Sequence, residues 1–185
     1  MKTVINLIVI IILLACTVTA KSQNVITNKW VQIESKINRL HLDVKKGSKK
    51  AQTPIWMYKK NNSSAQQWMF INAGGGYYYI KSRASGLYLD VQRSSRKSGA
   101  TIWQYAKNGT DAQKWKVINI RGGYVYLQSK VSGLYLDVKG GGLKSKTPVW
   151  QYQFNGTAAQ KWRIKTIRKK KSKKQEHEDW QYDCG

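Results

Sequence analysis

The chain has 185 residues, and its 33 Lys and Arg outnumber nine Asp and Glu to give a formal net charge of +24. This length limits it to one domain, or to one domain with short appendages. The charge predicts attraction to a polyanion, whether nucleic acid, an acidic membrane or an acidic polysaccharide, and does not choose among them.

Residues 1–20 have the pattern of a secretory signal peptide. A lysine precedes the apolar run VINLIVIIILLA, which is short for a membrane span, and Val18-Thr19-Ala20 offers small residues for cleavage. We therefore expect a secreted protein whose mature chain has no transmembrane segment and whose Cys184 has no internal disulfide partner. A second interpretation is that LLAC, ending at Cys16, resembles a bacterial lipoprotein box, so that Cys16 would carry a lipid anchor.

The rest of the chain contains a repeat of 47 residues. The motif AQQW, which begins at Ala65, returns twice as AQKW at intervals of 47 residues. The second and third units also share SGLYLDV, WQY and NGT, whereas the first keeps LDV, WMY and an Asn in the same register. The chain therefore consists of three homologous units and a tail. The units are residues 30–76, 77–123 and 124–170, and the tail is residues 168–185.

Each unit is expected to form about four short β-strands. Segments such as GGYVYLQS and GLYLDV are rich in Tyr, Val and Leu, and Gly-Gly, Ser-Gly and Asn-Gly turn signals separate them. A unit of this size cannot bury both faces of its strands, and the closure of three units on one another also removes exposed sheet edges. We predict an all-β fold, a β-trefoil with pseudo-threefold symmetry, over residues 21–167.

The repeats resemble those of the ricin B-chain-like family, the R-type β-trefoil lectins. The units of these lectins end in Gln-x-Trp and carry an Asp well upstream, as the three units do here from about Val25 to Ile167. The resemblance implies a carbohydrate-binding protein with up to three shallow sugar sites. It also implies that the Trp of each Gln-x-Trp belongs to the core, and that the Gln braces the binding Asp more than it contacts ligand.

A shallow sugar site needs a carboxylate that accepts hydrogen bonds and an aromatic face on which the sugar stacks. The Asp of LDV supplies the carboxylate, and the W-x-Y pair supplies the aromatic face. A turn anchor is the alternative role of the Asp. The two aromatic residues lie on one face of their strand, and the Trp either enlarges the platform or closes the pocket. The predicted carbohydrate-binding residues are Asp43, Trp56, Tyr58, Asn61 and Gln66 in unit 1, Asp90, Trp103, Tyr105, Asn108 and Gln113 in unit 2, and Asp137, Trp150, Tyr152, Asn155 and Gln160 in unit 3.

Two features of the loop before Gln-x-Trp complicate the choice of sugar. Galactose-binding relatives usually carry Asn immediately before the Gln, whereas this chain has Ala in all three units, which weakens a galactose assignment. The earlier Asn of each loop has three open roles: a tight turn, a ligand contact, or an N-glycosylation site. The Ala residues are Ala65, Ala112 and Ala159, and the Asn residues that satisfy the glycosylation pattern are Asn61, Asn62, Asn108 and Asn155.

Basic loops follow each Asp, and in the family this loop lies beside the sugar pocket. A rim of cations would favour sulfated, sialylated or phosphate-bearing glycans, and a merely solvated basic face is the alternative. The tail, residues 168–185, is a basic block followed by an acidic one and is interpreted as a disordered, polyanion-binding extension. The basic loop residues are Lys45, Lys46, Lys49 and Lys50, then Arg93, Arg96 and Lys97, then Lys139, Lys144 and Lys146.

Nothing in the sequence indicates catalysis, a metal site or a cofactor. His41 and His177 are the only histidines, and no Ser, Cys or paired carboxylate is placed beside a base. We therefore expect a glycan-binding protein with no specific nucleic-acid partner, not an enzyme. The alternatives are an electrostatic polyanion-binding or antimicrobial protein, and a trefoil that binds another protein instead of sugar.

Overall fold

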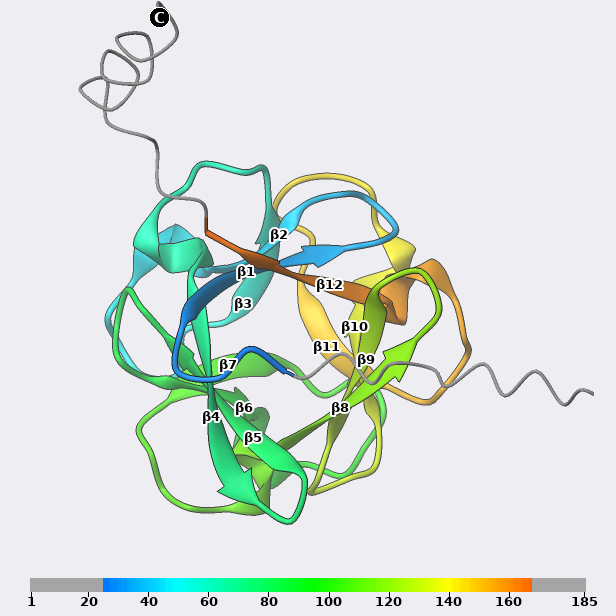
Figure 1. Ribbon diagram of the computed structural model, residues 1–185. Helices are drawn as coiled ribbons and strands as arrows, with labels where there is room; N and C mark the ends of the chain where they lie inside the picture. Colours follow the sequence, from blue (N-terminus) through cyan, green and yellow to red (C-terminus); the bar gives the residue numbers. More distant parts are fainter. Residues whose placement is uncertain (1–24, 168–185) are drawn as a thin grey trace, which may run out of the picture.

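The computed structural model describes residues 25–167, and the predicted signal peptide and tail lie outside this range. Within it the chain forms twelve β-strands, joined by turns and short 3₁₀ segments, and no α-helix (Figure 1). None of these residues forms a helix able to cross a membrane. The strands are β1 (Trp30–Ser35), β2 (His41–Val44), β3 (Ile55–Tyr58), β4 (Trp68–Gly74), β5 (Tyr77–Ser82), β6 (Tyr88–Val91), β7 (Ile102–Tyr105), β8 (Trp115–Ile120), β9 (Tyr124–Ser129), β10 (Tyr135–Val138), β11 (Val149–Tyr152) and β12 (Trp162–Thr166).

Six strands, two from each unit, close into an antiparallel barrel. Strand β1 pairs with β4, β4 with β5, β5 with β8, β8 with β9 and β9 with β12, and β12 returns to β1. The closing pair joins the first and last strands, with Val31 opposite Thr166 and Ser35 opposite Trp162. Each barrel strand is therefore paired on both sides, which removes the open sheet edge that a single unit would expose.

The remaining strands form three hairpins, β2–β3, β6–β7 and β10–β11. They meet about the pseudo-threefold axis through isolated bridges that join Pro54 to Trp103, Thr101 to Trp150 and Trp56 to Pro148. A closed six-stranded barrel with three hairpins is a β-trefoil, so the predicted fold and the predicted four strands per unit are confirmed.

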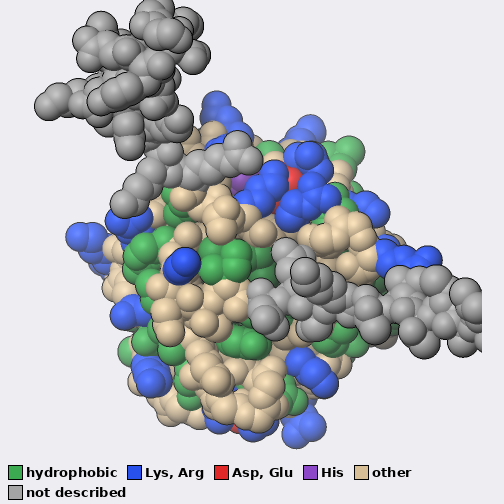
Figure 2. Space-filling view, viewed as in Figure 1, with side chains coloured by type: hydrophobic (Ala, Val, Ile, Leu, Met, Phe, Trp, Pro, Cys, Tyr) green, Lys and Arg blue, Asp and Glu red, His purple; other side chains and the backbone are tan. Residues whose placement is uncertain are grey.

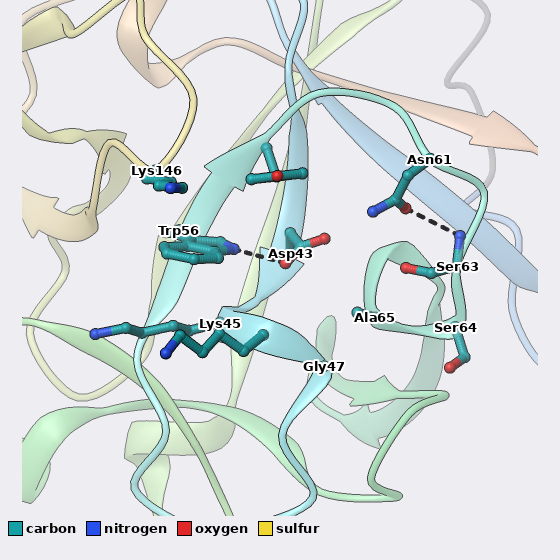
Figure 3. Close-up of a pocket in the computed structure, with 11 residues that line it drawn as sticks. Asp43, Lys45, Gly47, Trp56, Asn61, Ser63, Ser64, Ala65 and Lys146 are labelled. Atoms are coloured by element: carbon teal, nitrogen blue, oxygen red, sulfur yellow. Dashed lines mark hydrogen bonds between the residues drawn. The ribbon is translucent and has the colours of Figure 1, made fainter.

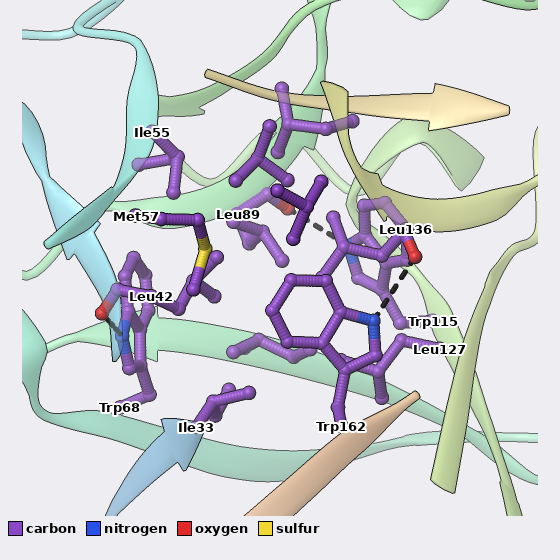
Figure 4. Packing of buried hydrophobic residues seen from close by; sticks show 14 of the residues in the cluster. Ile33, Leu42, Ile55, Met57, Trp68, Leu89, Trp115, Leu127, Leu136 and Trp162 are labelled. Carbon is purple, nitrogen blue, oxygen red and sulfur yellow. Dashed lines mark hydrogen bonds between the residues drawn. The ribbon is translucent and has the colours of Figure 1, made fainter. Parts of the chain in front are cut away.

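The core is built on the Trp of each Gln-x-Trp. These three indoles have no exposed surface, as the sequence predicts, and they lie among Leu, Ile and Met side chains from barrel and hairpins (Figure 4). Each Nε1 donates a hydrogen bond, of 2.9, 3.1 and 3.0 Å in chain order, to the carbonyl of the Leu in LDV. The bond ties a barrel strand to the hairpin strand that carries the Asp. The pairs are Trp68 with Leu42, Trp115 with Leu89 and Trp162 with Leu136.

Positive charge is spread over the surface of the body. Figure 2 shows Lys and Arg side chains around the visible face and few acidic ones. Among the described acids, Glu34 is buried and pairs with Arg39 and Lys165, and Asp111 pairs with Lys114 and Lys130.

Candidate functional site

The Asp and Trp of each unit are placed opposite each other by a hairpin. Asp43 on β2 faces Trp56 on β3, and the same register holds in the other two hairpins. The indole Nε1 donates to one carboxylate oxygen, Oδ1, over 2.6, 2.5 and 2.7 Å in units 1, 2 and 3. In unit 1 the other carboxylate oxygen points away from the indole, toward the side of Asn61 (Figure 3). The Trp thus holds the acid in place and leaves one oxygen for another donor.

Burial of these carboxyls is nearly complete, with residue exposures of 4, 3 and 3% in chain order. Burial raises the pKa of each Asp above its usual value, and hydrogen bonds from the site Trp and from the Gln of Gln-x-Trp oppose this rise. The charge is therefore only partly compensated by the protein. A ligand that brings further hydrogen-bond donors, as vicinal hydroxyls do, would complete its solvation.

The two aromatic residues of W-x-Y form one stacked platform in every unit. Ring centroids of Trp and Tyr lie 5.6, 5.7 and 5.1 Å apart in units 1, 2 and 3, with interplanar angles of 18, 21 and 15°. The alternation that the sequence predicts is confirmed. Each Trp ring covers one face of its Tyr and donates to the acid, and Trp103 is itself buried.

The Gln of Gln-x-Trp is fully buried in all three units. In unit 2 the Gln113 side-chain NH₂ donates to the Ala106 carbonyl over 2.7 Å, and its side-chain oxygen accepts the backbone N–H of Asn108 over 3.1 Å. The same pair of bonds occurs in units 1 and 3. The Gln therefore fixes the loop that carries the Asn, and its hydrogen bond to the Asp opposes the rise in pKa that burial causes.

The loop Asn forms a turn. Its side-chain oxygen accepts the backbone N–H two residues ahead, at 3.0, 3.1 and 3.0 Å for Asn61, Asn108 and Asn155. In unit 1 the amide nitrogen is turned toward the space beside Asp43 (Figure 3). One end of this side chain is therefore committed to the turn, while the other faces the candidate site as a donor.

These groups line open hollows. The unit-1 hollow, about 740 Å³, is lined by Asp43, Trp56, Tyr58 and Asn61, together with basic residues and the buried Ala65 that precedes Gln66. The unit-2 hollow, about 490 Å³, is lined by the equivalent Asp90, Trp103, Tyr105 and Asn108. In units 1 and 2 the fold thus brings acid, platform and loop Asn to one concave surface.

A loop from the neighbouring unit also reaches each site. Lys146 of unit 3 lines the unit-1 hollow, and Gln52 of unit 1 lines the unit-2 hollow. The equivalent residue of unit 2, Gly99, lies against the unit-3 Trp150, since a Cβ at Gly99 would meet that ring at 3.7 Å. All three have a positive φ, of 73, 63 and 86° in the order named. Sequence reasoning assigned Lys146 to the basic loop of its own unit and did not foresee this exchange.

The Gln of WQY, which sequence reasoning did not identify, anchors the loops that reach each site from the neighbouring unit. Gln104 is fully buried and donates to the carbonyls of Ser48 and Lys50 in unit 1, over 2.9 and 2.8 Å. Gln151 makes the same contacts with unit 2. Unit 1 has Met57 at this position, and Asn38 donates instead to the carbonyl of Gly142 over 3.0 Å.

Metal binding and acid–base chemistry have little support among the described residues, 25–167. No three His, Cys, Asp or Glu side chains there are grouped as metal ligands. His41 is buried, and burial is the main cause that lowers its pKa; neither ring nitrogen has a hydrogen-bond partner.

Comparison with known proteins agrees with this geometry. A family profile described as "Ricin-type beta-trefoil lectin domain-like" matches residues 20–105, 64–152 and 111–175. The chain belongs to this family. No curated protein sequence matches it significantly.

Solved structures support the lectin-domain assignment. The designed threefold-symmetric protein ThreeFoil is 30% identical with a TM-score of 0.74, over 75% of this chain and 99% of that one. The exo-β-1,3-galactanase 1,3Gal43A from Clostridium thermocellum gives the same identity and TM-score over 76% of this chain, which spans only 30% of the enzyme. The ricin B-like lectin of Macrolepiota procera, solved with lactose, shares the fold at 19% identity and a TM-score of 0.67, over 77% of this chain and 99% of that one. The described residues thus correspond to a ricin-type lectin domain, a module that also occurs attached to an enzyme.

Proposed function

We propose that the protein is a secreted lectin with up to three shallow sugar sites that act together on a polymeric or cell-surface glycan. One observation carries the proposal: in every unit a buried carboxylate is bound by a Trp that is stacked on a Tyr. Such a set matches the two sides of a sugar, hydroxyls toward the acid and C–H groups toward the rings. Sites that are weak singly gain strength by multivalent contact.

We further propose that the sites favour anionic glycans. Lys45, Lys46 and Lys146 line the unit-1 hollow and Arg93 lines the unit-2 hollow, so sulfate or carboxylate groups on a bound glycan would meet cations. Charge-assisted hydrogen bonds of this kind are stronger than neutral ones.

The decisive experiment is a glycan array probed at low and at high salt. Selective binding that survives high salt is expected, because hydrogen bonds and stacking within the hollows are screened less than exposed charge pairs. The double variant Asp90→Ala/Asp137→Ala should lose most of the retention. Unchanged binding by this variant would exclude the proposed unit-2 and unit-3 sites.

Electrostatic polyanion binding is the competing function, favoured by the net charge of +24. It predicts binding to any polyanion, collapse of that binding with added salt, and indifference to the two Asp substitutions. A blank array at both salt concentrations would instead point to a trefoil that binds another protein.

A further inference from the structure

A third concave region lies where the three hairpins meet. This axial hollow, about 360 Å³, is lined by Pro54, Thr101 and Pro148, which are equivalent positions of the three units. Because one residue from each unit borders it, it adjoins the pseudo-threefold axis, on the side of units 1 and 3. Trp56 and Trp150 form parts of its wall, so it adjoins the platforms of the unit-1 and unit-3 sites.

The charge around this axis does not follow the threefold symmetry. Lys45, Lys139 and Lys146 line the axial hollow, and no Asp or Glu is among the described residues that line it. The other residues at the positions equivalent to these three lysines are neutral. Positions 45, 92 and 139 hold Lys, Gln and Lys, and positions 52, 99 and 146 hold Gln, Gly and Lys. Cations are therefore concentrated on the side where units 1 and 3 meet.

The axial hollow and the unit-1 hollow form one continuous surface. Lys45, Trp56 and Lys146 line both of them. The two lysines thus stand on the ridge between the Asp43 site and the axis, and Lys139 lies on the far side with its Nζ 5.4 Å from the centre of the Trp150 ring. A ligand longer than one sugar that starts at Asp43 would pass between cations to reach the axis.

We propose that the axial hollow is a subsite for an acidic group, sulfate or carboxylate, on an oligosaccharide whose terminal sugar occupies the unit-1 hollow. This inference rests on the proposed sugar-binding function. The aromatic walls contact the C–H faces of the chain, and the three lysines bind the anion by charge-assisted hydrogen bonds. Units 2 and 3 have fewer cations at the equivalent positions, so their preference for acidic glycans should be weaker than that of unit 1. Lys146 is then a specificity-determining residue contributed by one unit to the site of another.

The test compares three forms of one glycosaminoglycan hexasaccharide by titration calorimetry at physiological salt. The forms are fully sulfated, desulfated with its carboxylates retained, and desulfated with its carboxylates reduced to alcohols. The wild-type protein should bind at least one acidic form about tenfold or more tightly than the neutral form. Whichever acidic form is preferred identifies the anion.

Two variants with equal loss of charge separate the subsite from general attraction. Lys139→Gln/Lys146→Gln should weaken the binding of the preferred acidic form about tenfold more than the binding of the neutral form. The matched control Lys29→Gln/Lys116→Gln removes two exposed charges at positions that line none of the three hollows. It should change neither affinity by more than about twofold, because exposed charges beyond a Debye length of roughly 8 Å are largely screened at physiological salt.

Three outcomes would overturn the inference. Equal weakening in both double variants would assign the effect to total charge, and unchanged acidic affinity in Lys139→Gln/Lys146→Gln would exclude the axial lysines. Equal binding of the acidic and neutral forms by the wild type would refute the subsite while leaving the proposed sugar sites intact. If no glycan of any kind bound, the proposed function itself would fail.

Discussion

Replacement of the three site acids by Asn should separate sugar binding from stability. In each unit the Trp indole donates to Oδ1, so an Asn would keep its oxygen on that side and turn its NH₂ toward the hollow. The variant therefore loses one charged acceptor per site while the packing is preserved. A hydrogen bond to a charged group is worth about 1.5–3 kcal/mol, which corresponds to a loss of roughly 10- to 150-fold in the affinity of each site.

The stability of the same variant should move in the opposite direction. Burial raises the folded-state pKa of Asp43, Asp90 and Asp137, so between the ordinary value of 3.8 and that raised pKa the folded protein binds more protons than the unfolded chain. The wild-type free energy of unfolding therefore falls as pH rises through this window and stays lower above it. Asn carries no charge, so at pH 7 the triple Asp→Asn variant should be as stable as the wild type or more stable. This advantage should disappear below pH 3.8.

Denaturant unfolding at pH 7 and pH 3.5, together with glycan titration, measures both effects. Asp111→Asn is a control that should change the stability in the opposite direction. Lys114 and Lys130 lower the pKa of Asp111, so removal of this charge should slightly reduce the free energy of unfolding at pH 7. The reasoning fails if the triple variant is less stable than the wild type at pH 7, or if it binds glycan undiminished.

Four further results are expected. Gln160→Ala leaves two backbone groups of the Asn loop without their partner and should cost about 1–3 kcal/mol of unfolding free energy, whereas Gln153→Ala, an exposed neighbour, should cost little. Trp115→Phe removes a fully buried indole and its bond to Leu89 and should cost about 2–4 kcal/mol by denaturation. Glycan binding should weaken on acidification at a higher pH than an ordinary Asp would give, because a protonated carboxyl loses its charge; binding that is flat down to pH 4 contradicts this. Gln52→Lys, at a position that already has a positive φ, should raise the affinity of the unit-2 hollow for sulfated sugar, and an unchanged preference counts against cation control.

The sequence predicted the fold, and it predicted which residues each hairpin brings together, because both depend on the pattern within one repeat. Asp90, Trp103 and Tyr105 lie on the two strands of a single hairpin, and the 47-residue period shows the set three times. The contacts between units were not accessible in the same way. Which loop reaches which neighbouring unit depends on how the three units are arranged about the axis. The placement of Lys146 in the same hollow as Asp43 therefore followed only from the structure.

One signal for those contacts was nevertheless present. Units 2 and 3 read WQY where unit 1 reads WMY, and the buried Gln104 accepts a hydrogen bond from Ser85 while it holds a loop of unit 1. Unit 1 has Asn38 at the position equivalent to Ser85, and that Asn binds the unit-3 loop directly. In unit 1, Asn38 therefore makes the loop contact that Gln104 and Gln151 make in the other units. Comparison of the repeats shows both substitutions, but their connection becomes visible only when the position of the neighbouring loop is known.

The pairing of β1 with β12 has a consequence for the newly made chain. The last strand, Trp162–Thr166, fills the gap between β1 and β9, so a nascent chain with two finished units presents unpaired barrel strands until residue 166 has emerged. Such edges invite pairing with another copy. Chains truncated before Trp162 are thus expected to exchange strands and form oligomers, because the five residues of β12 close the barrel within one chain.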